Sequence, residues 1–169
     1  DMPSLNRSVE KKLEEIRNGR MVILVDEDAP ESDGFFCLAA EKVTAQAVNY
    51  MLRYGRGIVY VTLVDERIRE LGIPMVPEEN SRLAGLLCGA SFSISLEGVH
   101  GVSAQGRAHT IQAAIADTTK HEDLVIPGHV QPLQARSGGV LARSGRTDAS
   151  VDLAHLAGFK PAGAICQIL

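Results

Sequence analysis

One glycine-bearing segment in the second half of the chain carries side chains that could hold an anion. Residues 138–149 read GGVLARSGRTDA, and they place Arg143 and Thr147 where a helix is expected to begin. A glycine turn that opens a helix, with an arginine and a threonine beside it, is a natural cradle for a phosphate group. The segment fits neither a P-loop nor a dinucleotide-binding fingerprint, so nucleotide binding is not indicated.

An acidic segment in the first half of the chain is the other candidate for chemistry. Residues 26–35 read DEDAPESDGF and supply the carboxylates of Asp26, Glu31 and Asp33. They follow an apolar stretch that reads as a strand, and loops at strand ends are where sites are commonly built. An acidic loop is more often plain solvated surface, however, and this one lacks the spacing and final glutamate of a calcium-binding loop. The residues alone leave both interpretations open.

The elements that must position these segments alternate between helix and strand. Leu5, Val9, Leu13 and Ile16 recur at helical spacing before Gly19, and Met21–Val25 reads as a buried strand. The pattern then predicts a helix capped by Thr44 and ending at Gly55, a strand over Gly57–Val64, a short helix over Asp65–Leu71 and a loop over Pro74–Gly89. A strand from Phe92 to Leu96 and a helix over Arg107–Ala116 follow. The last helix starts at Thr147 or Ser150, carries Leu153, Leu156 and Ala157 on its inner face and ends at Gly158, and a terminal strand over Ala164–Leu169 follows it. This alternation favours a layered α/β (α+β) domain over a helical bundle or an all-β sandwich.

Composition limits the class of protein and its partners. The 169 residues, 45% of them hydrophobic, are enough for one self-standing core, so a single domain over residues 1–169 is expected. Seventeen basic and twenty-one acidic side chains give a net charge of −4, which disfavours nucleic acid and anionic lipid as partners. No apolar run approaches the roughly 20 residues that cross a bilayer, and the charged N-terminus is unlike a signal peptide. We therefore expect a cytoplasmic protein without a membrane partner.

The remaining metal-ligating and nucleophilic side chains carry weaker signals. The chain has three widely spaced cysteines, Cys37, Cys88 and Cys166, and no Cys-x-x-Cys pair, which indicates reduced thiols packed in the core. Four of the histidines, at positions 100, 109, 121 and 155, lie at unrelated positions and are expected on the surface or on helices rather than around a metal.

Six short motifs together resemble one enzyme family. They are AAEKVT at 39–44, YGRGIVYV at 54–61, GVSA at 101–104, PGHVQPL at 127–133, GGVLARSG at 138–145 and LAGFKPAGAICQI at 156–168. In this order, over nearly the whole chain, they resemble 3,4-dihydroxy-2-butanone 4-phosphate synthase of the riboflavin pathway. The resemblance implies a homodimeric three-layer sandwich with a mixed sheet and with active sites at the dimer interface. It also implies a magnesium-dependent conversion of ribulose 5-phosphate into the four-carbon phosphate and formate.

The resemblance assigns roles to residues that match the family's pattern. Asp26 and Glu31 fall on an acidic position and on the metal-binding glutamate, and Asp33 shortens a further glutamate. His129 falls on the histidine that reaches the site from the other subunit. Arg143 and Thr147 fall on residues that hold the substrate phosphate. Members of the family often precede a GTP cyclohydrolase II domain, so this chain is expected to be the N-terminal half of a longer polypeptide with that partner fused or associated.

Several positions depart from the family's pattern. Arg146 stands where the family has a metal-binding histidine, and a guanidinium cannot ligate a metal. Other positions lose an arginine, two aspartates and a late acidic residue, and one glutamate is shortened; they are Pro30, Phe35, Gly106, Gln167 and Asp148 respectively. We therefore expect magnesium in the family but no cofactor here. We hypothesise that Arg146 and Glu31 form an ion pair at the former metal position.

Three functions remain open at this point. The first is a degenerate synthase domain that keeps the fold, the dimer and sugar-phosphate binding but not the reaction. The second is an active magnesium-dependent synthase. The third is a repurposed enzyme for another phosphorylated substrate, with Phe35 and Tyr60 making the pocket more apolar. Losing a general acid or base costs roughly 10²–10⁴-fold in rate, so the number of departures favours the first.

Overall fold

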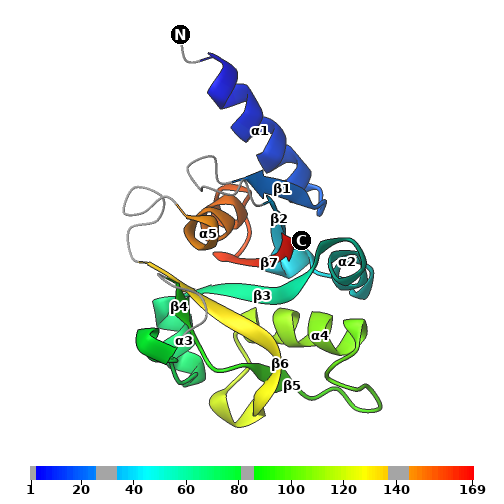
Figure 1. Cartoon of the computed structure of the whole chain (residues 1–169), viewed down its shortest axis with the longest axis vertical. Coiled ribbons are helices and arrows are strands. Elements are labelled where there is room, and N and C mark those ends of the chain that lie inside the picture. The colour runs from blue at the N-terminus through cyan, green and yellow to red at the C-terminus, as the bar shows by residue number, and fades with distance from the viewer. Residues whose placement is uncertain (1–2, 26–33, 81–85, 137–144) are drawn as a thin grey trace.

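A mixed β-sheet forms the middle layer of the molecule (Figure 1). The computed structural model describes residues 3–25, 34–80, 86–136 and 145–169. Within these residues the strands are β1 Val22–Val25, β2 Gly34–Ala39, β3 Arg56–Val64, β4 Leu87–Cys88, β5 Phe92–Ile94, β6 Leu124–Ala135 and β7 Ala162–Ile168. They run in the order β1-β2-β7-β3-β6-β4, and β5 pairs with β6 beside this path. β3 and β6 are parallel and the other paired strands are antiparallel, which confirms the predicted mixed sheet.

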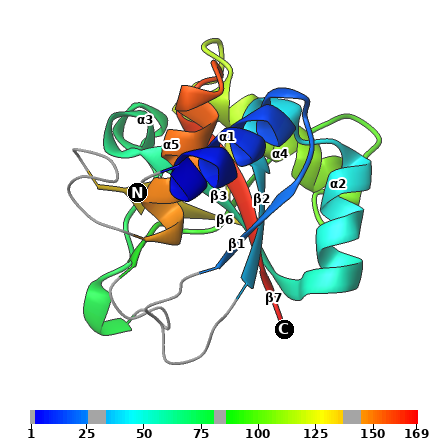
Figure 2. The same ribbon diagram turned by 90° about the horizontal axis from the view of Figure 1, so that it is seen from above.

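Helices cover both faces of this sheet and complete three layers (Figure 2). One face carries α1 Pro3–Arg17 and α5 Arg146–Leu156. The other carries α2 Ala45–Tyr50, which continues as a π-helical turn over Met51–Gly55, together with α3 Asp65–Leu71 and α4 Ala104–Ile115. The three-layer sandwich that the resemblance implied is therefore confirmed.

The core is divided by the sheet into two apolar clusters. The larger lies against α2, α3 and α4 and includes Val48, Met51, Ile68, Leu71 and Ile111. The smaller lies against α1 and α5 and includes Ile16, Tyr60, Leu133, Ala154 and Ile165. Each strand residue belongs to one cluster because side chains alternate between the two faces of a strand. The candidate site residues on α5 lie on the side of the smaller cluster.

Local hydrogen bonds explain where α2 and α4 begin and end. The Thr44 hydroxyl accepts from the backbone N–H of Ala47 at 3.1 Å, as its capping role predicts. The last carbonyls of α4 are bound by two cations from other elements. Arg67 donates from Nε to the carbonyl of Ala114 at 2.8 Å, and Lys160 donates from Nζ to that of Ile115 at 2.7 Å. These cations donate hydrogen bonds to carbonyls at the C-terminal end of the helix, where no N–H of the helix itself is available as a donor.

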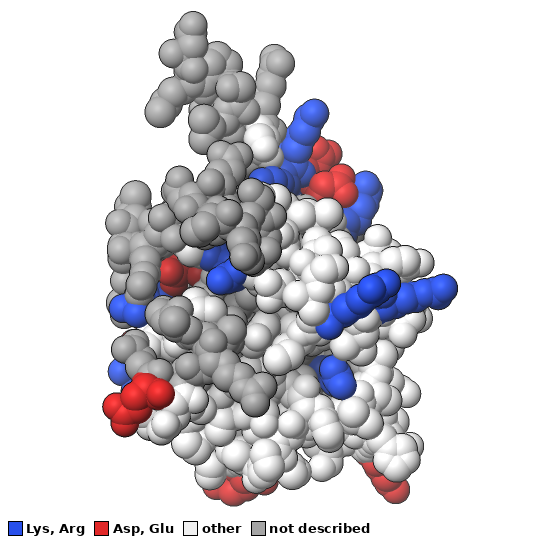
Figure 3. Space-filling view, in the orientation of Figure 1, with Lys and Arg blue, Asp and Glu red and all other residues white. Residues whose placement is uncertain are grey.

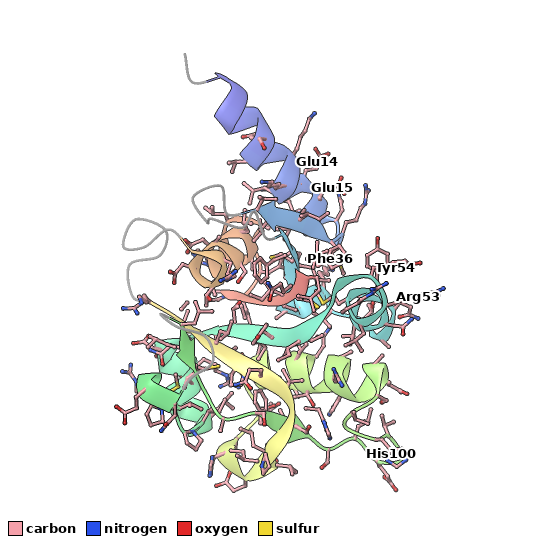
Figure 4. All side chains as sticks on the ribbon, in the orientation of Figure 1. Glu14, Glu15, Phe36, Arg53, Tyr54 and His100 are labelled. Atoms are coloured by element: carbon pink, nitrogen blue, oxygen red, sulfur yellow. The ribbon has the colours of Figure 1, made fainter. Side chains whose placement is uncertain are left out.

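Three aromatic rings join α2 and its π-helical turn to the sheet. The Phe36 ring on β2 lies 5.4 Å from that of Tyr50, which lies 4.6 Å from that of Tyr54. Figure 4 shows Arg53 and Tyr54 on the outer side of this turn, and the Arg53 guanidinium lies 5.5 Å from the Tyr54 ring. The rings extend the larger core cluster outward along one edge of the sheet.

The structure corrects four sequence-based expectations. Met21–Val25 is not a buried strand, because β1 is the edge strand of the described sheet and leaves Ile23 and Val25 each 51% exposed. The stretch Pro74–Gly89 is not wholly loop, since Leu87 and Cys88 pair with β6. The helix expected from Arg107 starts at Ala104, because the Ser103 hydroxyl caps it through the N–H of Gly106. Leu156, expected on the inner face of α5, is exposed.

Charge on the described surface is mixed in sign. Figure 3 shows acidic and basic side chains side by side over α1, and most of the same face is uncharged. None of the helices in the described ranges is both long and apolar enough to cross a membrane.

We predict that Gly128→Ala destabilises the fold strongly, because β5 crosses β6 in direct contact with Gly128. A Cβ there would lie 2.1 Å from the backbone carbon of Phe92 and from the nitrogen of Ser93. Two backbones must then separate, at a cost of at least about 3 kcal/mol. Gly98→Ala is the control, since its Cβ meets nothing within 4 Å and only its positive φ of 73° adds strain. Equal losses of unfolding free energy in urea would contradict the prediction.

Candidate functional site

Buried hydroxyl groups fix α5 to the sheet. Thr62 Oγ1 on β3 lies 2.7 Å from Ser150 Oγ on α5 and accepts from the backbone N–H of Gly163 at 2.9 Å. The Ser150 hydroxyl in turn donates to the carbonyl of Thr147 at 2.8 Å. Thr62 Oγ1 also donates to the carbonyl of Gly163 at 3.2 Å, so either hydroxyl can be the donor between Thr62 and Ser150. These hydrogen bonds connect β3 to the first turn of α5 and fix the distance between this helix and the sheet.

A buried carboxylate ties the start of α5 to the end of β6. Asp148 is 4% exposed, and its Oδ1 accepts from the backbone N–H of Arg136 at 2.8 Å. Arg136 directly follows the last residue of β6. The carboxylate that we identified in the sequence as a shortened glutamate therefore has a structural role, which the sequence did not indicate.

The first turn of α5 presents polar donors that the described residues leave unused. Thr147 is 5% exposed, and its Oγ1 has no hydrogen-bond partner within the described part of the chain. Gly145 precedes the helix and supplies no side-chain cap. The first N–H groups of any helix lack an intrahelical acceptor, and its dipole makes this end positive. This arrangement is suited to an anion, as the sequence predicted for Thr147.

The side chain of Arg146 stacks on an aromatic ring. Its Cζ lies 4.2 Å from the centroid of the Phe35 ring at the start of β2. This is a short cation–π contact, and the ring beneath is 4% exposed. Burial raises the pKa of the nearby Tyr60 phenol, with smaller contributions from Cys88 and Cys166, while the positive charge of Arg146 acts to lower it. Arg146 is therefore held as a cation in a partly apolar setting.

The residues around Phe35 come from neighbouring strands. Phe35 pairs with Gln167 on β7, and Tyr60 pairs with both Ile165 on β7 and Gln131 on β6. Directly paired residues project from the same face of a sheet, so Phe35 and Tyr60 share the α5 face with Gln131 and Gln167. The side-chain amide of Gln131 donates to the carbonyl of Gly89 and to Cys88 Sγ. An apolar and amide-lined floor thus lies beneath the start of α5.

Several predicted site residues fall outside the part of the chain that the structure describes. They are Asp26, Glu31, Asp33 and Arg143, together with the substituted Pro30. The hypothesis of an ion pair between Arg146 and Glu31 is therefore untested. Within the described residues, Arg146 contacts the Phe35 ring, and no hydrogen bond or ion pair of its guanidinium occurs there.

His129 lies on β6, well away from the contact between β6 and α5. It is exposed, and its backbone N–H donates to Ser93 Oγ at 3.0 Å. Seven residues separate it from Arg136, which is about 20 Å along an extended strand. Its side chain is therefore accessible from outside the chain.

Gly106 departs from the family's pattern in a way that involves the backbone. A Cβ at this position would lie 2.2 Å from the carbonyl oxygen of His100 and 2.9 Å from the Cα of Gly101. An aspartate, which the resemblance implies for this position, therefore requires the segment before α4 to move.

The remaining candidates behave as the sequence predicted. All three cysteines are free and buried, and burial raises the pKa of the Cys37 thiol to about 12. His100, His121 and His155 are exposed, and Figure 4 shows His100 at the end of the molecule opposite α1. In the described ranges no three His, Cys, Asp or Glu side chains gather as metal ligands would.

Comparison with known proteins identifies the family. A family model described as 3,4-dihydroxy-2-butanone 4-phosphate synthase matches residues 10–169. The chain belongs to the 3,4-dihydroxy-2-butanone 4-phosphate synthase family. It is 47% identical over 167 residues to the riboflavin biosynthesis protein RibBA of Aquifex aeolicus, covering 96% of this chain and 40% of that protein. It is 43% identical over 161 residues to a synthase of Neisseria meningitidis serogroup B, covering 93% and 43%.

Solved structures of synthases share the fold. The two-domain synthase RibBX of A. baumannii has a TM-score of 0.86 at 42% identity, covering 95% of this chain and 47% of that one. A synthase in complex with two magnesium ions has a TM-score of 0.88 at 31% identity, covering 95% and 74%. The chain thus spans less than half the length of the two curated relatives named above.

Arg146, which the resemblance assigns to the position of a metal-binding histidine, does not fit a divalent cation. A guanidinium has no lone pair to offer and keeps its positive charge at any physiological pH. Its carbon lies 4.2 Å from the centroid of an uncharged ring, where the family has an aspartate. Magnesium instead requires oxygen ligands in near-octahedral geometry.

We predict that Thr62→Val lowers the free energy of unfolding by about 1–3 kcal/mol, because it leaves the buried N–H of Gly163 without its side-chain acceptor and removes one of the two hydrogen bonds of Ser150 Oγ. The exposed Thr118 provides the matched variant, and Thr118→Val should change stability by less than about 0.5 kcal/mol. Urea denaturation of both variants tests this, and a neutral Thr62→Val would remove the anchoring role.

Proposed function

We propose that this chain is a degenerate 3,4-dihydroxy-2-butanone 4-phosphate synthase domain that has lost the family reaction and keeps a sugar-phosphate site in a dimeric, cytoplasmic protein. The observation that carries this proposal is the stacking of Arg146 on Phe35 at 4.2 Å. Two departures from the family's pattern contact one another, and the resemblance assigns one of them, Arg146, to the position of a metal-binding histidine. In this proposal the guanidinium of Arg146 takes the place of an exchangeable magnesium ion.

Loss of the metal removes the electrostatic basis of the reaction. In the family a bound magnesium ion polarises the sugar's oxygens and orients them for proton transfer. Arg146 can donate hydrogen bonds but cannot bind vicinal hydroxyls as a hard cation does. Fewer carboxylates are present to move protons as well, because Phe35, Gly106 and Gln167 each stand where the family's pattern has an acidic residue.

Retention of phosphate binding is supported by the first turn of α5. The buried hydroxyl of Thr147 without a described partner and the free N–H groups of the turn are donors suited to a phosphate. Arg143 is proposed to complete this cradle, as the resemblance implies. Asp26, Glu31 and Asp33 are proposed as remnants of the acidic half of the site.

A homodimer is supported by the exposure of His129 on β6. Its imidazole is accessible from outside, which suits a residue that enters the site of a second subunit. Exposed apolar side chains lie near it in sequence on the same strand, namely Val125 and Ile126. Such residues are common in the apolar centre of a subunit interface.

A partner with GTP cyclohydrolase II activity is proposed on the resemblance alone. The RibBA protein of Aquifex aeolicus is more than twice as long as the region that this chain matches. In this proposal the degenerate domain supports the folding or assembly of a cyclohydrolase. It contributes no synthase reaction of its own.

The identity to proteins named as synthases favours an active enzyme as the second candidate. Relatives from Neisseria and Pseudomonas with 41–44% identity carry that name. An active synthase would have to bind magnesium without the histidine that Arg146 replaces. A repurposed enzyme for another phosphorylated substrate remains the third candidate.

We predict that the purified protein releases no formate from ribulose 5-phosphate and magnesium above the uncatalysed rate. At roughly 10²–10⁴-fold for each acid or base lost, two losses reduce activity by at least about 10⁴-fold. The synthase of Neisseria meningitidis serves as the positive control in the same buffer. Magnesium-dependent formate release within tenfold of that control would establish the active synthase instead.

We also predict that the wild-type protein shows no magnesium binding by calorimetry at millimolar concentration, whereas Phe35→Asp combined with Arg146→His restores a measurable site. The double variant removes a fixed charge and supplies two ligands. Arg146→Gln is the matched control, because it removes the charge and supplies no imidazole. One-to-one magnesium binding by the wild type would contradict the proposal.

A further inference from the structure

The guanidinium of Arg146 contacts an aromatic ring, and its Cζ lies 4.2 Å from the centroid of Phe35. A cation–π contact does not use the five N–H donors of the group for hydrogen bonds to an acceptor. Within the described residues none of these donors has a hydrogen-bond acceptor. Among these residues Arg146 is thus in contact with a ring and not with a carboxylate.

The adjacent residue adds an independent unused donor. Thr147 is 5% exposed, and its Oγ1 is without a partner in the described ranges. Buried hydroxyl groups are nearly always hydrogen-bonded in folded proteins. Such an orphan, beside a guanidinium that has no acceptor among the described residues, points to a ligand with more than one acceptor group.

No described carboxylate neutralises this end of the helix by pairing with Arg146. Asp148 is the acidic residue of the first turn of α5, and its Oδ1 is bound to the backbone N–H of Arg136. The backbone N–H of Arg136, and not its side chain, makes this contact. The carboxylate of the first turn is therefore already bound, and the helix dipole makes this end of α5 positive.

We propose that Arg146 determines the specificity of this site for a doubly anionic ligand, a phosphorylated sugar acid whose carboxylate binds the guanidinium while its phosphate binds beside Thr147. This inference rests on the proposed retention of phosphate binding. A planar guanidinium binds a carboxylate through two parallel hydrogen bonds, and it gains much less from neutral hydroxyls. A magnesium ion in the family's site has the opposite preference, because it can bind the neutral oxygens of a ketose.

The position of Phe35 strengthens this preference. The ring lies beneath the guanidinium and restricts it to few orientations, which reduces the entropy lost when a ligand binds. An aspartate at this position, as in the family, would compete with the ligand for Arg146. The Phe35 ring itself does not compete with a ligand for the charge of Arg146.

Calorimetric titration of the purified protein in EDTA, with three probes, tests the proposal. The probes are 5-phospho-D-ribonate, which carries both anions, ribulose 5-phosphate, which lacks the carboxylate, and D-ribonate, which lacks the phosphate. We expect the phosphorylated acid to bind at least tenfold more tightly than ribulose 5-phosphate. Arg146→Gln should abolish this preference.

Two further variants separate charge from geometry and site from surface. Arg146→Lys keeps the charge but lacks the planar fork, so it should retain only part of the preference. Arg69→Gln removes an exposed arginine of α3 and should leave every affinity unchanged.

The outcomes distinguish the two proposals. Equal affinity for the phosphorylated acid and for ribulose 5-phosphate would overturn the role of Arg146 while leaving phosphate binding in place. Failure of both phosphorylated probes to bind at millimolar concentration would overturn phosphate retention and this inference together. A preference that persists in Arg146→Gln would assign the carboxylate to another residue and overturn the inference alone.

Discussion

The contact between the Arg146 guanidinium and the Phe35 ring is the interaction on which the character of this site depends. Either substitution alone would have a different effect on the charge and the ligands of the site. An arginine facing the family's aspartate would form an ion pair and neutralise itself, and a ring beneath a histidine would simply remove a metal ligand. Together they place a fixed cation over an uncharged surface at 4.2 Å. A cation–π contact of this kind contributes about 0.5–2 kcal/mol, which orients the side chain without cancelling its charge.

The anchoring of α5 explains why the fold can persist while the chemistry changes. The helix is held by neutral hydroxyl bonds between Thr62, Ser150 and the carbonyl of Thr147, and by the bond from the N–H of Arg136 to Asp148. None of these bonds uses a metal or a residue that the metal position requires. Substitutions at Phe35 and Arg146 therefore alter the ligand that the site can hold, and the frame that presents the site is maintained separately.

Locally encoded elements could be predicted from the sequence, and those that depend on distant residues could not. The helix that Thr44 caps, the short helix Asp65–Leu71 and the strand ending at Val64 follow from caps and spacing within a few residues. β6 was not predicted, because Pro127 and Pro132 interrupt its pattern. The strand forms nevertheless. At Pro132 it pairs through the carbonyl, which accepts from the backbone N–H of Gly89, so the N–H that proline lacks is not needed for this bond.

The site was predicted in the same partial way. The resemblance to the family identified the positions of Arg146, Thr147 and Phe35, but a sequence pattern contains no information about which side chains touch. A carboxylate is the partner usually expected for an arginine, so Glu31 was the natural hypothesis. The ring of Phe35, 111 positions earlier in the chain, could be found only once the strand β2 and the helix α5 had been placed against each other. An unexpected aromatic residue at a position normally held by an acid was the one available signal.

The departures from the family's pattern are of two physical kinds, and this bears on whether they can be reversed. At Phe35 and Arg146 the side chains differ while their strand and helix keep the family's fold, so exchanging them changes charge and ligands at a fixed place. At Gly106 the chain itself approaches too closely, because any Cβ would meet the carbonyl of His100 at 2.2 Å. A backbone that has closed over a lost side chain resists its return. Restoring the metal position is therefore a smaller step than restoring the full set of carboxylates, and recovery of metal binding need not bring recovery of the reaction.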